Sequence, residues 1–386
     1  LCGPRAAHAA GIMPRAGEAK ADASATAVKL GRDWTMFKGN ARRTGSSADE
    51  VKPPLAIAWK QQLGGSIHFS SPIVGNGMVF IGTGDSENKQ RAGVYALDAA
   101  TGNIAWKYPT NAKVAHTVCL DGDTVYAASH DGVVHAIDAK TGTKRWTYAL
   151  GSPLEYWMHA SPVVAEGKVF VGIGMNFVAL NAADGKLLWQ LPNTSAGWWN
   201  TYSSPLFSEA KIFASYPGAG TFAVDAGSGK QLWTNEKLTC SVTTLAAGKG
   251  MVIAAAQNSI YALGAADGHE LWRSSNKGAL SSPVITENML LLALGNGKVA
   301  KVDMENGADV WQSGNLAQAK NRFYFSPPFI ATPAVSGAFI YVAGTDGQLS
   351  VLENATGKTL QSLDLGAPLT ASPGLSGNSV FVASYN

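Results

Sequence analysis

Three histidines in the first half of the chain carry the side chains best suited to chemistry: His68, His116 and His159. Three imidazoles can bind Zn²⁺ and leave one coordination position open, and a histidine beside a tyrosine can act as a general acid–base pair. The three stand at different distances from the extended segments that follow them, so their convergence is not assured. We therefore interpret them as hydrogen-bonded side chains and predict no metal site. His135 and His269 are interpreted as surface positions.

Aromatic and polar residues gather at the same places in the chain, and they form the candidate binding site. Exposed aromatic rings beside hydrogen-bonding groups suit sugar rings or an extended segment of a protein partner. The alternative is that the rings only plug the centre of the fold. No Ser-His-Asp order, phosphate loop or HExxH string occurs, so the catalytic residues are unknown. The candidate binding residues are His68, Phe69, His116, Tyr156, Trp157, His159, Trp198, Trp199, Asn200, Tyr202, Arg322 and Tyr324.

An internal repeat predicts the elements that position these residues. The string from Ala96 to Trp106 has Asp98, Thr101 and Gly102 at its turn, and equivalent strings end at Trp146, Trp189, Trp233, Trp272 and Trp311. The spacings of 40, 43, 44, 39 and 39 residues match one four-stranded propeller blade. A seventh copy has Gln361 in place of the tryptophan. We interpret the tryptophans as contacts between neighbouring blades.

Strand signals around each string predict an all-β, eight-bladed β-propeller of four-stranded antiparallel blades. Each blade begins with an innermost strand A, led by Ser-Pro or Thr-Pro in six blades, and continues through B and C to an outermost D that ends near the tryptophan. The last blade stops after strand B. Leu55–Trp59 is the expected D strand that closes the ring, and Asp33–Phe37 is the candidate for its C strand.

In this strand order the D–A loops and B–C turns share one face of the ring, here called the mouth. The A–B and C–D turns share the other. The candidate binding residues precede the A strands of several blades, so the mouth is the expected site.

Composition limits the class of partner. Residues 1–60 hold ten of the 30 Lys and Arg but only five of the 27 Asp and Glu, so the remaining chain is close to neutral. A neutral propeller body is a poor phosphate-binding surface, and we predict no nucleic-acid partner. No apolar run is long enough for a membrane-spanning helix. Cys2, Cys119 and Cys240 are isolated and indicate neither a disulfide framework nor a cysteine metal site.

The first 32 residues are Ala-rich and without periodicity, and we expect a flexible or processed leader before a single propeller domain at 33–386. Leu1-Cys2-Gly3 also resembles the end of a lipoprotein signal, in which Cys2 would carry lipid. A leader of either kind predicts a location outside the cytoplasm.

The repeated A-x-D-x-x-T-G-x-x-x-W strings resemble the pyrroloquinoline quinone (PQQ)-like repeat family, and the stretch from Asp33 to Gly45 resembles the W-x-M-F-x-G-N-x-x-R-T-G leader of its bacterial members. The family includes quinoprotein dehydrogenases, the outer-membrane β-barrel assembly lipoprotein, and propeller modules attached to hydrolases. For a dehydrogenase the resemblance implies an adjacent cysteine pair and a calcium site of Glu, Asn and Asp ligands. This chain has no adjacent cysteines.

These observations favour a non-catalytic binding or scaffolding propeller outside the cytoplasm of a bacterium, without a cofactor and with a protein or glycan partner at the mouth. A polysaccharide lyase or hydrolase that uses His and Tyr is the first alternative. A PQQ-dependent dehydrogenase is the second.

Overall fold

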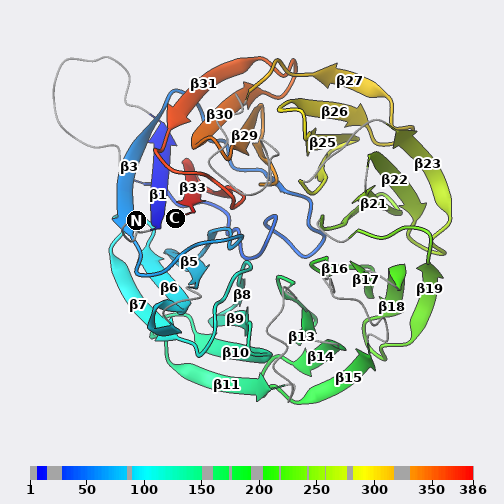
Figure 1. Ribbon diagram of the computed structural model, residues 1–386, viewed down its shortest axis with the longest axis horizontal. Coiled ribbons are helices and arrows are strands. Elements are labelled where there is room, and N and C mark those ends of the chain that lie inside the picture. Colours follow the sequence, from blue (N-terminus) through cyan, green and yellow to red (C-terminus); the bar gives the residue numbers. More distant parts are fainter. Residues whose placement is uncertain are drawn as a thin grey trace, which may run out of the picture.

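The computed structural model describes residues 7–14, 28–84, 89–149, 160–173, 176–192, 203–216, 219–240, 243–256, 258–275, 281–316 and 331–385. The strands form eight sheets arranged in a ring, as Figure 1 shows. Within each blade successive strands pair antiparallel, from the axis outward. The predicted eight-bladed β-propeller is confirmed.

Blades 1 to 4 follow the chain in order. Blade 1 contains β4 (Ile73–Gly75), β5 (Met78–Thr83), β6 (Gly93–Asp98) and β7 (Ile104–Pro109), with a 3₁₀ turn η1 (Lys89–Arg91) before β6. Blade 2 contains β8 (Cys119–Asp121), β9 (Thr124–Ser129), β10 (Val133–Asp138) and β11 (Lys144–Ala149). Blade 3 contains β12 (Val163–Ala165), β13 (Lys168–Ile173), β14 (Asn176–Asn181) and β15 (Leu187–Pro192). Blade 4 contains β16 (Leu206–Ser208), β17 (Lys211–Tyr216), β18 (Gly220–Asp225) and β19 (Gln231–Asn235).

Blades 5 to 7 continue the same pattern. Blade 5 contains β20 (Ala246–Gly248), β21 (Met251–Ala256), β22 (Ser259–Gly264) and β23 (Glu270–Ser275). Blade 6 contains β24 (Val284–Thr286), β25 (Met289–Ala293), β26 (Val299–Asp303) and β27 (Asp309–Gln312). Blade 7 contains β28 (Ala334–Ser336), β29 (Phe339–Ala343), β30 (Gln348–Glu353) and β31 (Thr359–Asp364), and the short strand β2 (Ser46–Ser47) adds to β28 in parallel.

Blade 8 is built from both ends of the chain. Its A and B strands are β32 (Gly374–Ser376) and β33 (Ser379–Ser384), and its D strand is β3 (Leu55–Gln62). The predicted closure by N- and C-terminal strands is confirmed. The C strand is β1 (His8–Pro14), which pairs with both β33 and β3, so the expectation that Asp33–Phe37 fills this place was wrong. Residues 8–14 thus belong to the sheet, although we expected a flexible leader through residue 32.

Seven tryptophans join neighbouring blades in one repeated geometry. Each indole Nε1 donates to a backbone carbonyl in the C–D turn of the next blade, for example Trp146 to Ala182 at 3.0 Å. The indole lies against the glycine of that turn: a Cβ added to Gly185 would stand 2.6 Å from the Trp146 ring. The glycine is needed for this close approach and for its φ of 72°. The other six tryptophans are Trp59, Trp106, Trp189, Trp233, Trp272 and Trp311.

The Ser-Pro signature has its own structural role near the axis. The backbone N–H of the Ser or Thr in one blade donates to the side-chain hydroxyl of the equivalent residue in the next blade, as from Ser282 to Thr332 at 3.1 Å. These bonds measure 2.8–3.3 Å and link seven of the eight blade interfaces. The hydroxyls therefore form an almost continuous ring of hydrogen bonds around the axis.

Residues 29–51 form a segment, here called the strap, that lines the inner end of the A–B hairpins. It runs once around the axis, and this path is called its lap. In blades 1, 2, 4, 5, 6 and 7 the middle residue of strand A donates its N–H to a strap carbonyl, in the same order as the strap runs. Lys29 and Asp49, at the two ends of the lap, both contact the A–B hairpin of blade 8. Figure 1 shows this segment in blue across the centre of the ring.

The Arg43 side chain contacts blade 3, for which the strap backbone has no such hydrogen bond among the described residues, and also blade 4. It is fully buried and donates to the carbonyls of Ser161 and Pro162 in blade 3 and of Pro205 in blade 4, at 2.9–3.1 Å. Lys38 is also buried and donates to the carbonyl of Pro283 in blade 6. The W-x-M-F-x-G-N-x-x-R-T-G motif thus covers the A–B end of the axis.

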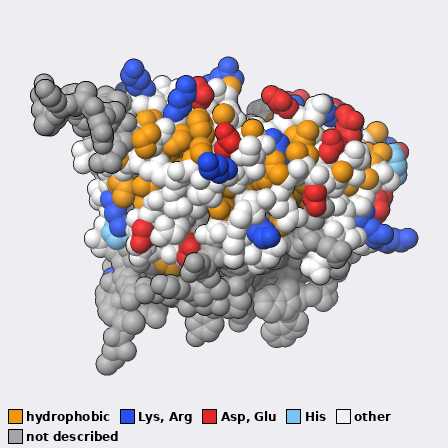
Figure 2. Space-filling view, turned by 90° about the horizontal axis from the view of Figure 1, so that it is seen from above, with side chains coloured by type: hydrophobic (Ala, Val, Ile, Leu, Met, Phe, Trp, Pro, Cys, Tyr) orange, Lys and Arg blue, Asp and Glu red, His pale blue; other side chains and the backbone are white. Residues whose placement is uncertain are grey.

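The outermost strands leave a row of apolar side chains in solvent. They are between 42% and 50% exposed, and they lie one or two positions before the residue that contacts the next blade. Figure 2 shows orange side chains of this kind along the side of the ring. The row comprises Ile57, Ile104, Leu187, Leu188, Leu232, Leu271, Val310 and Leu360.

Candidate functional site

The described part of the mouth contains three of the expected site residues. His68 and Phe69 lie between β3 and β4, and His116 lies between β7 and β8. The others, Tyr156, Trp157, His159, Trp198, Trp199, Asn200, Tyr202, Arg322 and Tyr324, lie outside the described residues. Cys2 does too.

The structure brings His68, Phe69 and His116 together between blades 8, 1 and 2. The Phe69 and His116 rings have centroids 5.8 Å apart with planes tilted by 33°. The Phe69 N–H donates to the carbonyl of Ala115 at 3.1 Å, which fixes the two loops against each other. His68 contacts the edge of Tyr385 with centroids 5.2 Å apart. Residues from three blades therefore form one surface.

His130 and Lys113 extend this surface. The N–H of His130, in the β9–β10 turn, donates to the carbonyl of Lys113 at 3.0 Å. Burial, and then the charges of His68 and Lys113, lower the pKa of His116 to about 4. Burial lowers the pKa of His130 further still, with added repulsion from Lys113, His116 and His68. The imidazoles of His116 and His130 are therefore neutral at neutral pH. We call His68, Phe69, His116 and His130 the mouth cluster.

A metal site does not follow from this cluster. Across the described ranges no group of three or more His, Cys, Asp or Glu side chains lies close enough to hold a metal ion. His159, the third histidine of that hypothesis, lies outside these ranges. The prediction of no metal site stays a prediction.

His135 is buried, so its interpretation as a surface residue was wrong. Its Nε2 lies 2.8 Å from Ser129 Oγ and its Nδ1 lies 3.2 Å from the hydroxyl of Tyr108, which comes from the D strand of blade 1. Burial lowers its pKa to about 4. Ser129 is fully buried and also donates to Asp131. The arrangement joins blades 1 and 2, and Ser129 is not accessible as a nucleophile.

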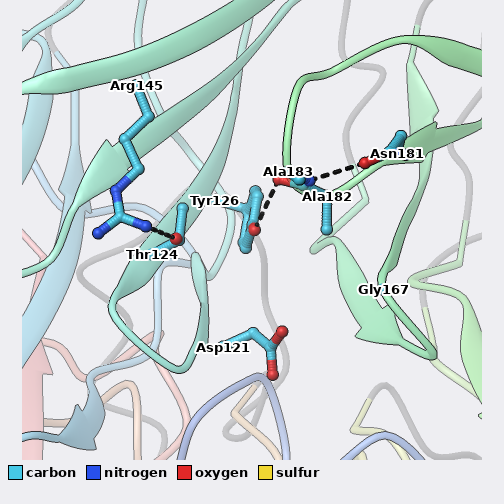
Figure 3. Close-up of a pocket in the computed structure, with 8 residues that line it drawn as sticks. All are labelled: Asp121, Thr124, Tyr126, Arg145, Gly167, Asn181, Ala182 and Ala183. Atoms are coloured by element: carbon cyan, nitrogen blue, oxygen red, sulfur yellow. Dashed lines mark hydrogen bonds between the residues drawn. The ribbon is translucent and has the colours of Figure 1, made fainter.

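A separate pocket opens between blades 2 and 3, near the C–D turns and away from the mouth. It has a volume of about 400 Å³ and is drawn in Figure 3. One wall comes from blade 2 and the other from the β13 and β14 ends of blade 3. Its lining residues are Asp121, Thr124, Tyr126, Arg145, Gly167, Asn181, Ala182 and Ala183.

Sequence reasoning missed Lys113, Tyr385 and the whole of this pocket. Tyr385 comes from the end of the chain, and its contact with His68 depends on ring closure. The signal for the pocket was present in the repeat, because Asp121 and Arg145 stand where other copies have uncharged residues. No helix of the described ranges has the length and apolar character needed to cross a bilayer.

Comparisons with known proteins give two kinds of relative. A family model described as Outer membrane protein assembly factor BamB matches residues 56–238, 219–322 and 295–386. The chain is 31% identical over 230 residues to Quinohemoprotein alcohol dehydrogenase ADH IIB of Pseudomonas putida, covering 54% of this chain and 32% of that protein. It is 24% identical over 213 residues to Outer membrane protein assembly factor BamB of Yersinia pestis, covering 52% of this chain and 54% of that protein.

Solved structures agree on the fold. The crystal structure of a quinohemoprotein alcohol dehydrogenase from Comamonas testosteroni superposes with a TM-score of 0.73 at 13% identity, covering 92% of this chain and 80% of that one. At this identity the likeness shows the fold alone. The matches cover about a quarter to a half of the length of the curated relatives.

Proposed function

Because the chain belongs to the PQQ-like propeller family whose model is described as Outer membrane protein assembly factor BamB, we propose that it is a non-catalytic binding or scaffolding propeller. It works outside the cytoplasm of a bacterium, in the periplasm, at the outer membrane or after secretion. Its mouth binds a protein or glycan partner.

The carrying observation is the difference between the two ends of the axis. At the A–B end, the strap and the buried side chains of Arg43 and Lys38 cover the axis. At the mouth the structure instead shows the ring contact between Phe69 and His116. The remaining aromatic candidate residues lie outside the described ranges, and we propose from their sequence positions before the A strands that they belong to the same face. The strap closes the axis at the A–B end, and we therefore propose that the partner of the axial site binds at the mouth.

Crosslinking from defined positions tests this assignment. A photoreactive phenylalanine derivative at Phe69 should capture a discrete partner in intact cell envelopes, and the same residue at Trp198 should capture the same partner. The control position is Lys249, in the A–B hairpin of blade 5 on the opposite face. Capture of one partner from Lys249 and none from Phe69 or Trp198 would reverse the assignment of the binding face.

A polysaccharide-acting enzyme is the first rival. Purified protein incubated with acidic polysaccharides should produce no new reducing ends and no unsaturated products. Product formation by the wild type that is abolished in His159→Ala would contradict the scaffold proposal and support a polysaccharide-acting enzyme.

A quinone-dependent dehydrogenase is the second rival, favoured by the 31% identity to a quinohemoprotein alcohol dehydrogenase. The described residues do not fit such a cofactor: Cys119 and Cys240 are separate, buried free thiols, and burial raises the pKa of each to about 12. No group of three or more His, Cys, Asp or Glu side chains in the described ranges is placed to hold a metal ion, although calcium sites in proteins use several oxygen ligands. We propose that no quinone binds. Incubation with PQQ and Ca²⁺ should give no dye reduction with alcohols or aldose sugars, and stoichiometric retention of the quinone with catalytic dye reduction would contradict this.

A further inference from the structure

Blade 2 departs from the repeat at two positions that face the same pocket. The last residue of its A strand is Asp121, and the residue before its tryptophan is Arg145. At the first position the other blades have Gly75, Ala165, Ser208, Gly248, Thr286, Ser336 and Ser376. At the second position they have Ala58, Ala105, Leu188, Leu232, Leu271, Val310 and Leu360. Seven copies form the same fold without charge at either place, so the fold does not require these two residues.

Hydrogen bonds hold the walls of this pocket in place. The Tyr126 hydroxyl and the Trp146 indole both donate to the carbonyl of Ala182 at 3.0 Å, which joins blade 2 to the C–D turn of blade 3. In that turn the Ala183 N–H donates to the Asn181 side chain at 2.9 Å. Figure 3 shows Asp121 at the foot of the pocket and Arg145 above it, on the other side of Thr124. The pocket is therefore a fixed feature of the interface.

The charges of the pocket do not balance. Arg145 donates to Thr124 Oγ1 at 2.6 Å and to Asp138 Oδ2 at 2.7 Å, and the guanidinium lowers the pKa of the Asp138 carboxyl well below its usual range. The Arg145 charge is thereby offset. The Asp121 side chain is exposed, and its carboxylate has no hydrogen bond or ion pair with another described residue. The pKa of the Tyr126 hydroxyl is raised mainly by burial, and the negative charge of Asp121 adds to this increase. Of the two charged residues that line the pocket, Arg145 is paired with Asp138 outside it, and Asp121 is left without a cationic partner among the described residues.

We propose that this pocket binds the side chain of a lysine or arginine from a protein partner, with its cation on the Asp121 carboxylate. The aliphatic stem would lie along Tyr126 and the methyl groups of Ala182 and Ala183. A volume of about 400 Å³ is at the small end of ligand pockets, which run from roughly 300 to 1,000 Å³. It suits one long side chain better than an oligomeric ligand. A cation paired with a carboxylate through charged hydrogen bonds gives both attraction and orientation. The pocket lies away from the mouth, so the proposal stands independently of the function proposed above.

A titration with blocked single residues tests the proposal directly. The protein is labelled on alanine methyl groups, and the Ala182 and Ala183 signals are followed during addition of Nα-acetyl-arginine methylamide or Nα-acetyl-lysine methylamide. We expect saturable shifts with dissociation constants in the millimolar range, weakened several-fold by raising the salt concentration because the ion pair is partly exposed. The neutral Nα-acetyl-norleucine and acidic Nα-acetyl-glutamate methylamides should leave both signals in place.

Two matched variants locate the charge. Asp121→Asn keeps the shape of the side chain and should weaken arginine binding at least tenfold. Asp123→Asn is the control, because Asp123 lies in the same hairpin, is also exposed and does not line the pocket. Both variants should melt at the wild-type temperature. Equal shifts with norleucine, shifts with glutamate, no shifts with either basic probe, or unchanged binding by Asp121→Asn would each overturn the proposal.

Discussion

Gln361 and Leu55 form a two-way hydrogen bond at the interface of blades 7 and 8, where the repeat lacks its tryptophan. The Gln361 amide donates to the Leu55 carbonyl at 2.8 Å, and the Leu55 N–H donates to Gln361 Oε1 at 2.6 Å. Leu55 stands four residues before Trp59, where the other seven turns have the glycine that lies under an indole. A side chain at that place leaves no room for a tryptophan, so the two departures from the repeat depend on each other.

We expect Gln361→Trp to lower the free energy of unfolding by about 1–3 kcal/mol, the usual cost of overpacking. The measurement is urea unfolding at neutral pH. Leu55→Gly should recover part of the loss in the Gln361→Trp background but cost stability in the wild type. Additive effects of the two substitutions would show that the residues are not coupled in this way.

The turn glycines allow the steric and backbone contributions to be separated within blade 5. Gly268 has a φ of 73° and its added Cβ would stand 2.3 Å from Trp233, whereas Gly250 has a φ of 71° and nothing within 4 Å. Gly250→Ala should cost about 1–2 kcal/mol for the left-handed backbone alone. Gly268→Ala should cost about 1–3 kcal/mol more, because the indole must move. Equal losses in urea unfolding would mean that the tryptophan adapts without cost.

Two classes of tryptophan should respond in opposite ways to removal. Trp146→Ala takes a buried indole from between blades 2 and 3 and should cost about 3–5 kcal/mol. Trp198→Ala and Trp199→Ala should leave the melting temperature unchanged and weaken partner binding at the mouth, because neither belongs to a repeat string. Thermal melting and crosslinking yield distinguish the classes. Losses of stability at Trp198 and Trp199 as large as at Trp146, with crosslinking unchanged, would show that they only plug the channel.

Most of the fold could be predicted from the repeat. Each Asp-x-x-Thr-Gly turn and the tryptophan that follows it form a local sequence pattern, and their contact partners lie one blade away. Trp106 bonds to blade 2 and Trp311 to blade 7 in the way the pattern predicts. The strand β1 was missed because residues 8–14 show no alternation of polar and apolar side chains, and their pairing depends on β33 from the far end of the chain. The lap of the strap was missed for the same reason: its partners are spread over eight blades.

The candidate site was predictable only where sequence position alone decides the face. The A strands that follow His68 and His116 predicted that both lie at the mouth, and a hydrogen bond from Phe69 to Ala115 joins their two loops. His135 was misplaced because its burial depends on Tyr108 of the neighbouring blade, which no local pattern indicates.

Stability should fall as the pH is lowered from 7 to 4.5. Burial lowers the pKa of His116 and of His135 to about 4, and that of His130 further. The unfolded chain therefore takes up protons near pH 6.5, before the folded protein does, so the stability present above that pH is lost as the pH falls toward the folded values. Each group contributes up to about 1.4 kcal/mol per pH unit. The free energy of unfolding, measured with urea at several pH values in this window, should change less steeply with pH for His116→Asn than for the wild type. An identical dependence on pH would contradict the burial of a neutral imidazole at this position.

Arg43 should be among the most costly residues to replace, although it carries a charge. Its guanidinium is fully buried and gives hydrogen bonds to carbonyls of Phe37, Ser161, Pro162 and Pro205, while burial lowers its pKa only to about 10, so it stays protonated. Arg43→Met would leave these buried carbonyls without a donor, at about 1–3 kcal/mol for each unsatisfied group. We expect a loss on the order of 3–5 kcal/mol in urea unfolding, as for other broken buried charge networks.

Arg43→Lys should have a free energy of unfolding between those of the wild type and Arg43→Met. One ammonium group cannot replace the several fixed N–H groups that reach both blades 3 and 4. Arg42→Met is the control: Arg42 is the adjacent residue, its side chain is exposed, and its backbone carbonyl still accepts from Ala247 at 3.1 Å. The free energy of unfolding of Arg42→Met should stay within about 0.5 kcal/mol of the wild-type value. The strap holds the A–B hairpins together through Arg43, so Arg43→Met should also speed proteolytic cleavage between residues 29 and 51. Equal stability and equal cleavage rates for the Arg43 and Arg42 variants would show that the backbone of the strap alone holds it in place.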